Sequence, residues 1–175
     1  MEAASSSCGR ARSGRAAGHG SPERGWFIVK LLAVSWGCEV STTALRRAAT
    51  LSKEPGAELH VAHIWTLPLP YVPEFMESTH CARQEEEARR LMETAVETVE
   101  AAGGTVAGTH IGSGFPESEV IRLSEELGAE TVIAGKQRRG VLKRLFVGCA
   151  AERIARHAPC PVVLVEQESP LASPV

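Results

Sequence analysis

The residue types with the most evident chemistry lie in one short stretch near the C-terminus, residues 131–154. An apolar segment with the sequence TVIAG leads into a basic loop, and a predicted helix follows the loop. Backbone N–H groups of a glycine-containing loop and the N-terminus of a helix both attract anions, so this order of elements is typical of a phosphate site. The candidate residues of this site are, in chain order, Gly135, Arg138, Lys143, Arg144, Gly148 and Cys149.

Two of these residues differ from what a phosphate loop usually contains. Arg138 stands where a glycine would let the backbone approach a phosphate, and Cys149 stands where a hydroxyl would donate a hydrogen bond. Arg138 brings five N–H donors that match phosphate oxygens, and Cys149 keeps its backbone N–H. Two interpretations stay open: weak or altered nucleotide binding, or a solvated basic loop. A further hypothesis makes Cys149 a redox-sensitive thiol, because a helix N-terminus and nearby cations favour the thiolate.

Alternating strand and helix patterns position this loop. Short apolar runs predict strands at residues 26–34, 58–65, 105–111, 130–135 and 161–165. Apolar residues at three- and four-residue spacing predict helices over residues 41–54, 81–102, 116–128 and 150–158, the first with Ser41 as its N-cap. The alternation predicts an α/β fold, a three-layer α/β/α sandwich with a five-stranded parallel sheet. Ligands of such sheets bind beyond the C-terminal ends of the strands, where the strand order reverses.

Composition argues against several other classes of function. The net charge of −2 over 175 residues gives no general attraction to nucleic acid or to an anionic membrane. No apolar run approaches the about 20 residues that a membrane span needs. His60 and His63 are three residues apart on a predicted strand and should point to opposite faces, so we predict no metal site there. The five cysteines are odd in number and form no C-x-x-C motif, which favours a reducing compartment and hence a cytoplasmic protein.

The folded part is expected to be one domain over residues 26–167. Residues 1–25 are rich in small residues, serine and arginine, and they lack the apolar segment of a secretory signal. We therefore expect this segment to be a disordered tail. The polar, proline-containing residues 168–175 are expected to be a loose C-terminal tail.

Three segments of the chain carry a resemblance to a known family. They read GAELHVAHI, ELGAETVIAG and GVLKRLFVGCAAERIARHAPCPVVLV. With these segments the chain resembles the universal stress protein family from about Lys30 to Val165. The resemblance implies the strand order 3-2-1-4-5, with the first and fourth strands at the point of reversal. It also implies a homodimer and, in one branch of the family, an adenine-nucleotide site.

The nucleotide-binding branch of that family carries the pattern G-x-x-G-x9-G-[ST] after the fourth strand. Carried over, Gly135 and Gly148 match glycines, Arg138 replaces the middle glycine, and Cys149 replaces the hydroxyl residue. The family's aspartate after the first strand falls on Trp36, or on Ser35 if the loop is one residue longer. Ile64 matches the residue whose backbone faces adenine. The resemblance thus implies a degenerate site for ATP or AMP, and it leaves any metal requirement open.

The last strand and the function complete the expectations. The implied strand order puts residues 161–165 at a sheet edge, where an uncharged strand offers unpaired backbone groups to a second chain. We expect a homodimer through Val162, Val163, Leu164 and Val165. The expected function is that of a regulatory stress-response protein rather than an enzyme. Alternatives are a dimeric interaction module without a nucleotide and, with less support, an ATP-hydrolysing or adenylating enzyme, since SWGCEVS only faintly resembles the loop of ATP pyrophosphatases.

Overall fold

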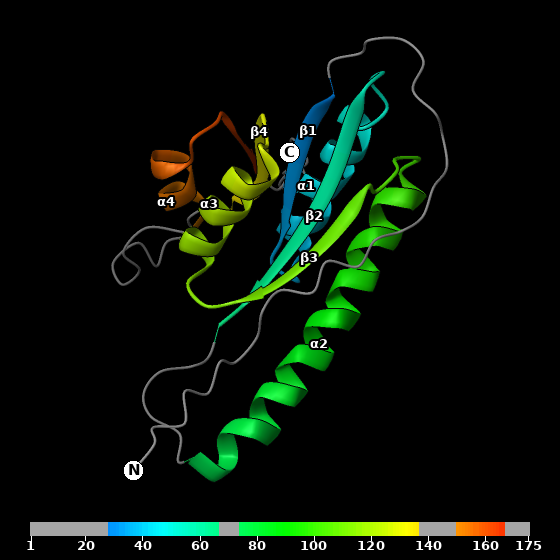
Figure 1. The fold of residues 1–175 in the computed structure, drawn as a ribbon. Helices are drawn as coiled ribbons and strands as arrows, with labels where there is room; N and C mark the ends of the chain where they lie inside the picture. Colours follow the sequence, from blue (N-terminus) through cyan, green and yellow to red (C-terminus); the bar gives the residue numbers. More distant parts are fainter. Residues whose placement is uncertain (1–27, 67–73, 137–149, 167–175) are drawn as a thin grey trace, which may run out of the picture.

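Five strands and four helices alternate along the described part of the chain (Figure 1). The computed structural model describes residues 28–66, 74–136 and 150–166, and for residues 74–81 it describes the backbone alone. The elements are β1 Val29–Ser35, α1 Glu39–Leu51, β2 Ala57–Trp65, α2 Glu74–Ala101, β3 Gly108–Ser113, α3 Pro116–Leu127, β4 Thr131–Lys136, α4 Ala150–His157 and β5 Val162–Glu166.

The strands form a single sheet in the order β3-β2-β1-β4-β5, and all neighbours run parallel. Both the fold class and the strand order expected from the sequence are confirmed. The central strands β1, β2 and β4 are apolar runs because helices cover them on both sides, which removes the polar alternation of a half-exposed strand. Among the described residues, no helix combines the length and the apolar character needed to cross a membrane.

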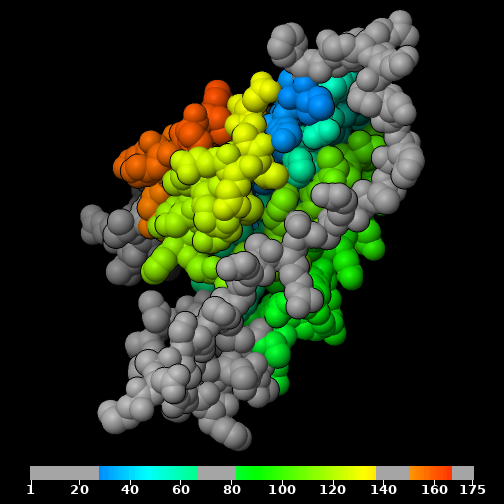
Figure 2. Space-filling view, viewed as in Figure 1, coloured from blue at the N-terminus to red at the C-terminus, as the bar shows by residue number. Residues whose placement is uncertain are grey.

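Each face of the sheet packs against its own pair of helices. α1 and α2 cover one face, and the cluster beneath them contains Leu31, Ala33, Ala44, Leu45, Leu59, Val61, Met92, Ala95, Val99 and Ile133. α3 and α4 cover the other face over Leu32, Val34, Ala62, Ile64, Val120, Leu123, Val132, Ala151 and Ile154. Figure 2 shows α3 and α4 side by side, and α2 along the neighbouring flank. The chain is therefore a three-layer α/β/α sandwich.

The start of α1 differs from its prediction. The N-cap residue is Cys38, whose carbonyl accepts the N–H groups of Ser41 and Thr42. Ser41 lies inside the first turn, and its hydroxyl accepts the backbone N–H of Trp36 at 2.7 Å. Ser41 therefore accepts a hydrogen bond from the preceding turn instead of capping α1, and it lies three residues after the N-cap residue Cys38.

The boundaries of α2 and β3 also differ from those predicted from the sequence. α2 begins at Glu74 rather than near residue 81, because residues 74–80 follow Pro73 without an apolar period that would reveal a helix. β3 covers Gly108–Ser113, two or three residues later than predicted, and its edge position leaves it only half buried. Pro116 at the start of α3 and Gly128 in the left-handed region at its end follow their predictions.

Candidate functional site

The C-terminal ends of β1 and β4 lie side by side, at the point where the strand order reverses. Val34 pairs with Ala134, so Ser35 and Gly135 are the next residues of the two strands. α1 leaves β1 over one face of the sheet, and α4 follows β4 on the other face. The connections that follow β1 and β4 therefore leave towards opposite faces of the sheet. This is the geometry that creates a ligand crevice in parallel sheets.

A tight turn connects β1 to α1. Gly37 has φ +67°, in the left-handed region that other residues rarely adopt, and it lets the chain reverse within three residues. Trp36 is partly buried and packs against the apolar cluster on the α3 and α4 side. Cys38 is exposed, and its Sγ lies 3.6 Å from the hydroxyl of Ser41. The position that the resemblance assigned to a carboxylate thus holds an indole that packs towards α3 and α4.

A hydrogen bond from His63 connects this turn to β2. It lies opposite Ser35 in the register of β1 and β2, and its Nδ1 is 2.9 Å from the Ser35 carbonyl oxygen. A carbonyl only accepts, so Nδ1 carries the proton and donates it. Burial lowers the pKa of His63, while the Ser35 carbonyl and Glu87 act in the opposite direction. The sequence analysis did not select His63 for the site, because only the strand register brings it to Ser35.

Gly135 has a role in packing. A Cβ atom built on it would lie 2.7 Å from the Val40 carbonyl oxygen and 2.8 Å from the Val40 Cγ1. Both distances are shorter than real Cβ contacts, and the carbonyl belongs to the first turn of α1. Gly135 therefore allows the N-terminus of α1 to press against β4, and this contact sets the width of the crevice from one side.

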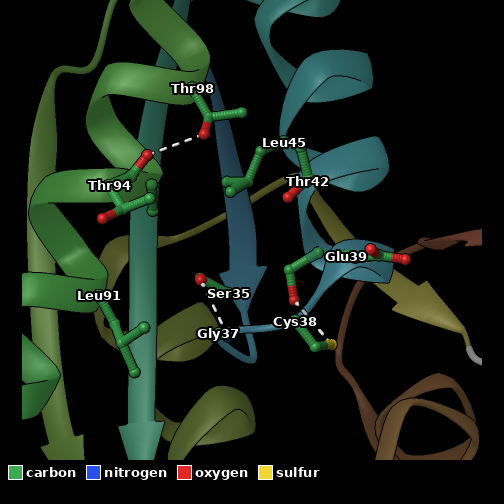
Figure 3. A pocket seen from close by; sticks show the side chains of 11 residues that line it. Ser35, Gly37, Cys38, Glu39, Thr42, Leu45, Leu91, Thr94 and Thr98 are labelled. Carbon is green, nitrogen blue, oxygen red and sulfur yellow. Dashed lines mark hydrogen bonds between the residues drawn. The ribbon is translucent and has the colours of Figure 1, made fainter.

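A cavity of about 330 Å³ opens beside the end of β1, between α1 and α2 (Figure 3). Its wall combines hydroxyl groups from β1, α1 and α2 with leucine side chains from both helices. Its lining consists of Ser35, Gly37, Cys38, Glu39, Ser41, Thr42, Leu45, Leu91, Thr94, Ala95 and Thr98. Thr94 and Thr98 bond back to carbonyls of their own helix, which aligns their side chains along the wall. The cavity is suited to a ligand that has both apolar and polar groups.

The ion pairs near the end of β4 limit the free charge there. The ammonium group of Lys136 lies 3.5 Å from Glu152 of α4 and 3.9 Å from Glu166 of β5. Arg153 of α4 lies 3.1 Å from Glu117 of α3. These carboxylates already engage the nearest described cations.

The structure brings part of the predicted site together. Ser35, Trp36 and Gly135 meet at the ends of β1 and β4. Ile64 lies at the end of β2, pairs with Gly112, and points its side chain into the cluster on the α3 and α4 face rather than into the cavity. Five predicted residues lie outside the described residues: Arg138, Lys143, Arg144, Gly148 and Cys149. Within the described ranges, no group of three or more metal-binding side chains occurs.

Comparison with known proteins gives consistent matches. The model of the universal stress protein family matches residues 30–166. The universal stress protein YxiE of Bacillus subtilis is 27% identical over 145 residues, which cover 78% of this chain and 97% of that protein. A universal stress protein of Methanocaldococcus jannaschii is 26% identical over 141 residues, with 79% and 82% covered.

Solved structures show the same fold. The universal stress protein UspA from Lactobacillus plantarum has a TM-score of 0.65 at 15% identity and covers 81% of this chain and 99% of its own. A universal stress protein in complex with cAMP has a TM-score of 0.62 at 18% identity, with 78% and 96% covered. One from Archaeoglobus fulgidus in complex with dAMP has a TM-score of 0.53 at 18% identity, with 79% and 98% covered.

Proposed function

The chain belongs to the universal stress protein family, and we propose that it is a regulatory stress-response protein that binds ATP or AMP weakly. The nucleotide would lie at the ends of β1 and β4. Two structural relatives were solved with cAMP and with dAMP, which supports an adenine nucleotide as the ligand class. The observation that carries the proposal is the cavity beside Ser35, because Ser35 ends β1, one of the two strands at which the strand order reverses. We further propose a cytoplasmic location, for which the free thiols of Cys38 and Cys160 are the support.

The nucleoside part of the ligand fits the cavity between α1 and α2. A volume of about 330 Å³ is at the lower end of the range of small-molecule sites, ~300–1,000 Å³. Leu45 and Leu91 offer apolar contact to the face of a base, and the hydroxyls of Ser35 and Thr42 offer partners to ribose oxygens. This arrangement supports a site that recognises a neutral, hydroxylated group.

The phosphates would extend towards the start of α4. α4 begins at Ala150, so Gly148 and Cys149 immediately precede its first described residue. Its N-terminus favours a negative charge, and Lys143 and Arg144 would add attraction. Neither Ser35 nor Trp36 offers a carboxylate to the ribose, and a carboxylate bond to a hydroxyl is among the stronger hydrogen bonds. Loss of that bond is our reason for expecting dissociation constants in the micromolar range or weaker.

Filling the cavity tests where the nucleoside binds. Thr94→Trp places an indole in the cavity and should raise the dissociation constant for ATP at least about tenfold, a loss of about 1.4 kcal/mol. Thr50→Trp is the matched control, because Thr50 also bonds back to its own helix but lies outside the cavity. Lys143→Ala with Arg144→Ala should weaken binding and flatten its dependence on salt. Calorimetry measures all four proteins.

The outcomes separate the parts of the proposal. One outcome is that Thr94→Trp leaves ATP binding unchanged while Lys143→Ala with Arg144→Ala abolishes it. A nucleotide site would then still be supported, but the nucleoside would not bind in the cavity. Absence of heat and of competition at millimolar ATP in the unmodified protein would overturn nucleotide binding and favour the alternative, a dimeric interaction module.

The edge strand β5 supports a homodimer as part of either function. β5 ends the sheet, so one side of its backbone offers unpaired N–H and C=O groups, and Val163 is 38% exposed there. The four residues before Glu166 carry no charge, and Glu166 itself forms an ion pair with Lys136 of β4. We propose pairing with a second copy through Val162, Val163, Leu164 and Val165.

Val163→Lys should convert the dimer into a monomer or an aggregate. In a two-fold antiparallel pair the added charge would face its own copy, and the valine burial would be lost. Thr109→Lys, on the opposite edge strand β3, is the control and should leave the assembly unchanged. Light scattering at micromolar concentration reports the mass, and a monomeric unmodified protein would contradict the proposal.

A further inference from the structure

Two histidines on neighbouring strands share a close contact away from the cavity. His60 of β2 and His110 of the edge strand β3 place Nδ1 and Nε2 3.1 Å apart, with ring centroids separated by 5.3 Å. They face α3, since His60 alternates with Leu59 and Val61, which face α1 and α2. His63 points to the opposite face, as predicted. The two histidines are 50 residues apart in the sequence, so no local sequence pattern predicts their contact.

Gly108 makes room for this histidine pair. It lies opposite His60 in the register of β2 and β3. A Cβ atom on Gly108 would lie 2.8 Å from the His60 Nδ1 and 3.7 Å from the His110 Nε2. Any larger residue at this position would push the His60 ring away from its partner. The contact is therefore built by three residues of two strands and does not arise from the chance meeting of two surface side chains.

Burial decides which ring donates the shared proton. The Nε2 of His60 is buried and has no hydrogen-bond partner among the described residues. A proton on this buried nitrogen would leave an N–H donor without an acceptor, whereas a proton on Nδ1 has the His110 Nε2 at 3.1 Å as its acceptor. The neutral His60 therefore carries its proton on Nδ1 and donates it to Nε2 of His110. His110 then carries its own proton on Nδ1.

A further proton has no favourable place in this arrangement. On His60 it would occupy the buried Nε2. On the His110 Nε2 it would replace the acceptor lone pair and remove the bond, unless the His60 proton moved to its buried nitrogen. Each route leaves a donor without an acceptor. The contact between β2 and β3 at this point is thus compatible with neutral imidazoles only.

The charged groups around the histidine pair do not offset this restriction. Burial is the largest influence and lowers the His60 pKa, while Glu58 of β2 raises it and Lys30 of β1 lowers it. Burial also lowers the pKa of His110, with His60 and Arg122 acting in the same direction and Glu126 against them. Arg122 of α3 forms ion pairs with Glu119 and Glu126.

We propose that the His60–His110 pair is a proton-sensitive contact that holds the edge strand β3 to β2 at neutral pH and releases it in acid. β3 is suited to this role because it is bonded on one side only and is half buried along most of its length. Release separates both rings and lets each take up a proton in water. The opening of β3 then becomes about tenfold more favourable per pH unit for each proton taken up, below pH ~6.5.

Hydrogen exchange of the full-length protein tests the proposal. Exchange of the β3 amides, corrected for the intrinsic effect of pH, should rise between pH 7 and pH 5 more steeply than exchange of the β4 amides. His110→Gln keeps an acceptor for the His60 Nδ1–H but cannot be protonated, so the pH response of β3 should fall by about one proton. His157→Gln is the control, because His157 is exposed on α4 and bonds within its own helix.

Two results would overturn the inference. One is an equal pH response of β3 in the unmodified protein and in His110→Gln. The other comes from nitrogen NMR of the unmodified protein at neutral pH, which reports the protonated nitrogen of each ring without any substitution. The expected spectrum has His60 protonated on Nδ1 and His110 with an unprotonated Nε2. A proton on the His60 Nε2 would remove the basis for the acid response.

Discussion

Replacing Gly135 with alanine is expected to lower the free energy of unfolding by about 1–3 kcal/mol, and replacing it with valine by about 3 kcal/mol or more. The added Cβ would lie 2.7 Å from the Val40 carbonyl oxygen and 2.9 Å from the Val40 carbonyl carbon. These are backbone atoms, so relief requires the first turn of α1 to move off β4. Gly135 is not in the left-handed region, so the loss comes from crowding rather than from backbone strain.

Urea unfolding of matched variants separates the causes. Val40→Ala removes the Cγ1 contact at 2.8 Å but leaves the backbone contacts, so it should restore only part of the stability of Gly135→Ala. Gly128→Ala is the contrasting control: a Cβ meets nothing within 4 Å there, and φ +62° alone makes it costly, by ~1–2 kcal/mol. Its cost should be independent of Val40→Ala.

The same variants report on the phosphate hypothesis for Gly135. If Gly135→Ala unfolds like the unmodified protein, then α1 does not press on β4 as described. If it is stable but loses ATP affinity, the glycine serves the ligand and not the packing. The predicted outcome is a loss of stability, with any loss of affinity explained by the widened crevice.

Acidification from pH 7.5 to 5.5 is expected to lower the free energy of unfolding by about 2 kcal/mol. Burial is the largest influence on three histidines, His60, His63 and His110, and it lowers the pKa of each in the folded protein. The unfolded chain then binds more protons below the ordinary histidine pKa of ~6.5, so stability is full above that pH and is lost as the pH falls towards the folded values.

His63 should account for the largest single share of this effect. It is 5% exposed, whereas His60 and His110 are only partly buried and are therefore better solvated. His63→Gln retains a side-chain donor for the Ser35 carbonyl but does not titrate, and it should reduce the loss by about 1 kcal/mol. Urea unfolding at pH 7.5, 6.5 and 5.5 measures this, and His157→Gln should behave like the unmodified protein. A stability that is flat over this range would contradict the burial of these histidines.

The sequence by itself determined the architecture of this protein. Apolar runs of strand length, separated by segments with helical spacing, predicted five strands and four helices, and strict alternation predicted a parallel sheet covered on both faces. Gly128 and Pro116 marked the ends of α3 correctly. These signals succeed because they are local: a covered strand needs apolar residues on both sides, and a helix end needs a residue with a suitable φ.

The sequence was less informative where one residue type can serve two purposes. Ser41 has the chemistry of an N-cap, yet its hydroxyl accepts the N–H of Trp36 from within the first turn, and Cys38 occupies the cap. The sequence did not predict the start of α2 at Glu74, because apolar residues do not recur at helical spacing in its first two turns. The basic loop residues Arg138, Lys143 and Arg144 stay predictions, since they lie outside the described residues.

Only the tertiary structure decided which distant residues meet. The register of β1 and β2 brings His63 to the Ser35 carbonyl, and the register of β2 and β3 brings His60 to His110. The close approach of α1 to β4 gives Gly135 its packing role, and the gap between α1 and α2 forms the cavity beside Ser35. A one-residue change of register would turn each side chain to the other face while leaving every local pattern intact. Periodicity within a segment therefore predicts the segment, whereas contacts between segments follow from packing the whole core.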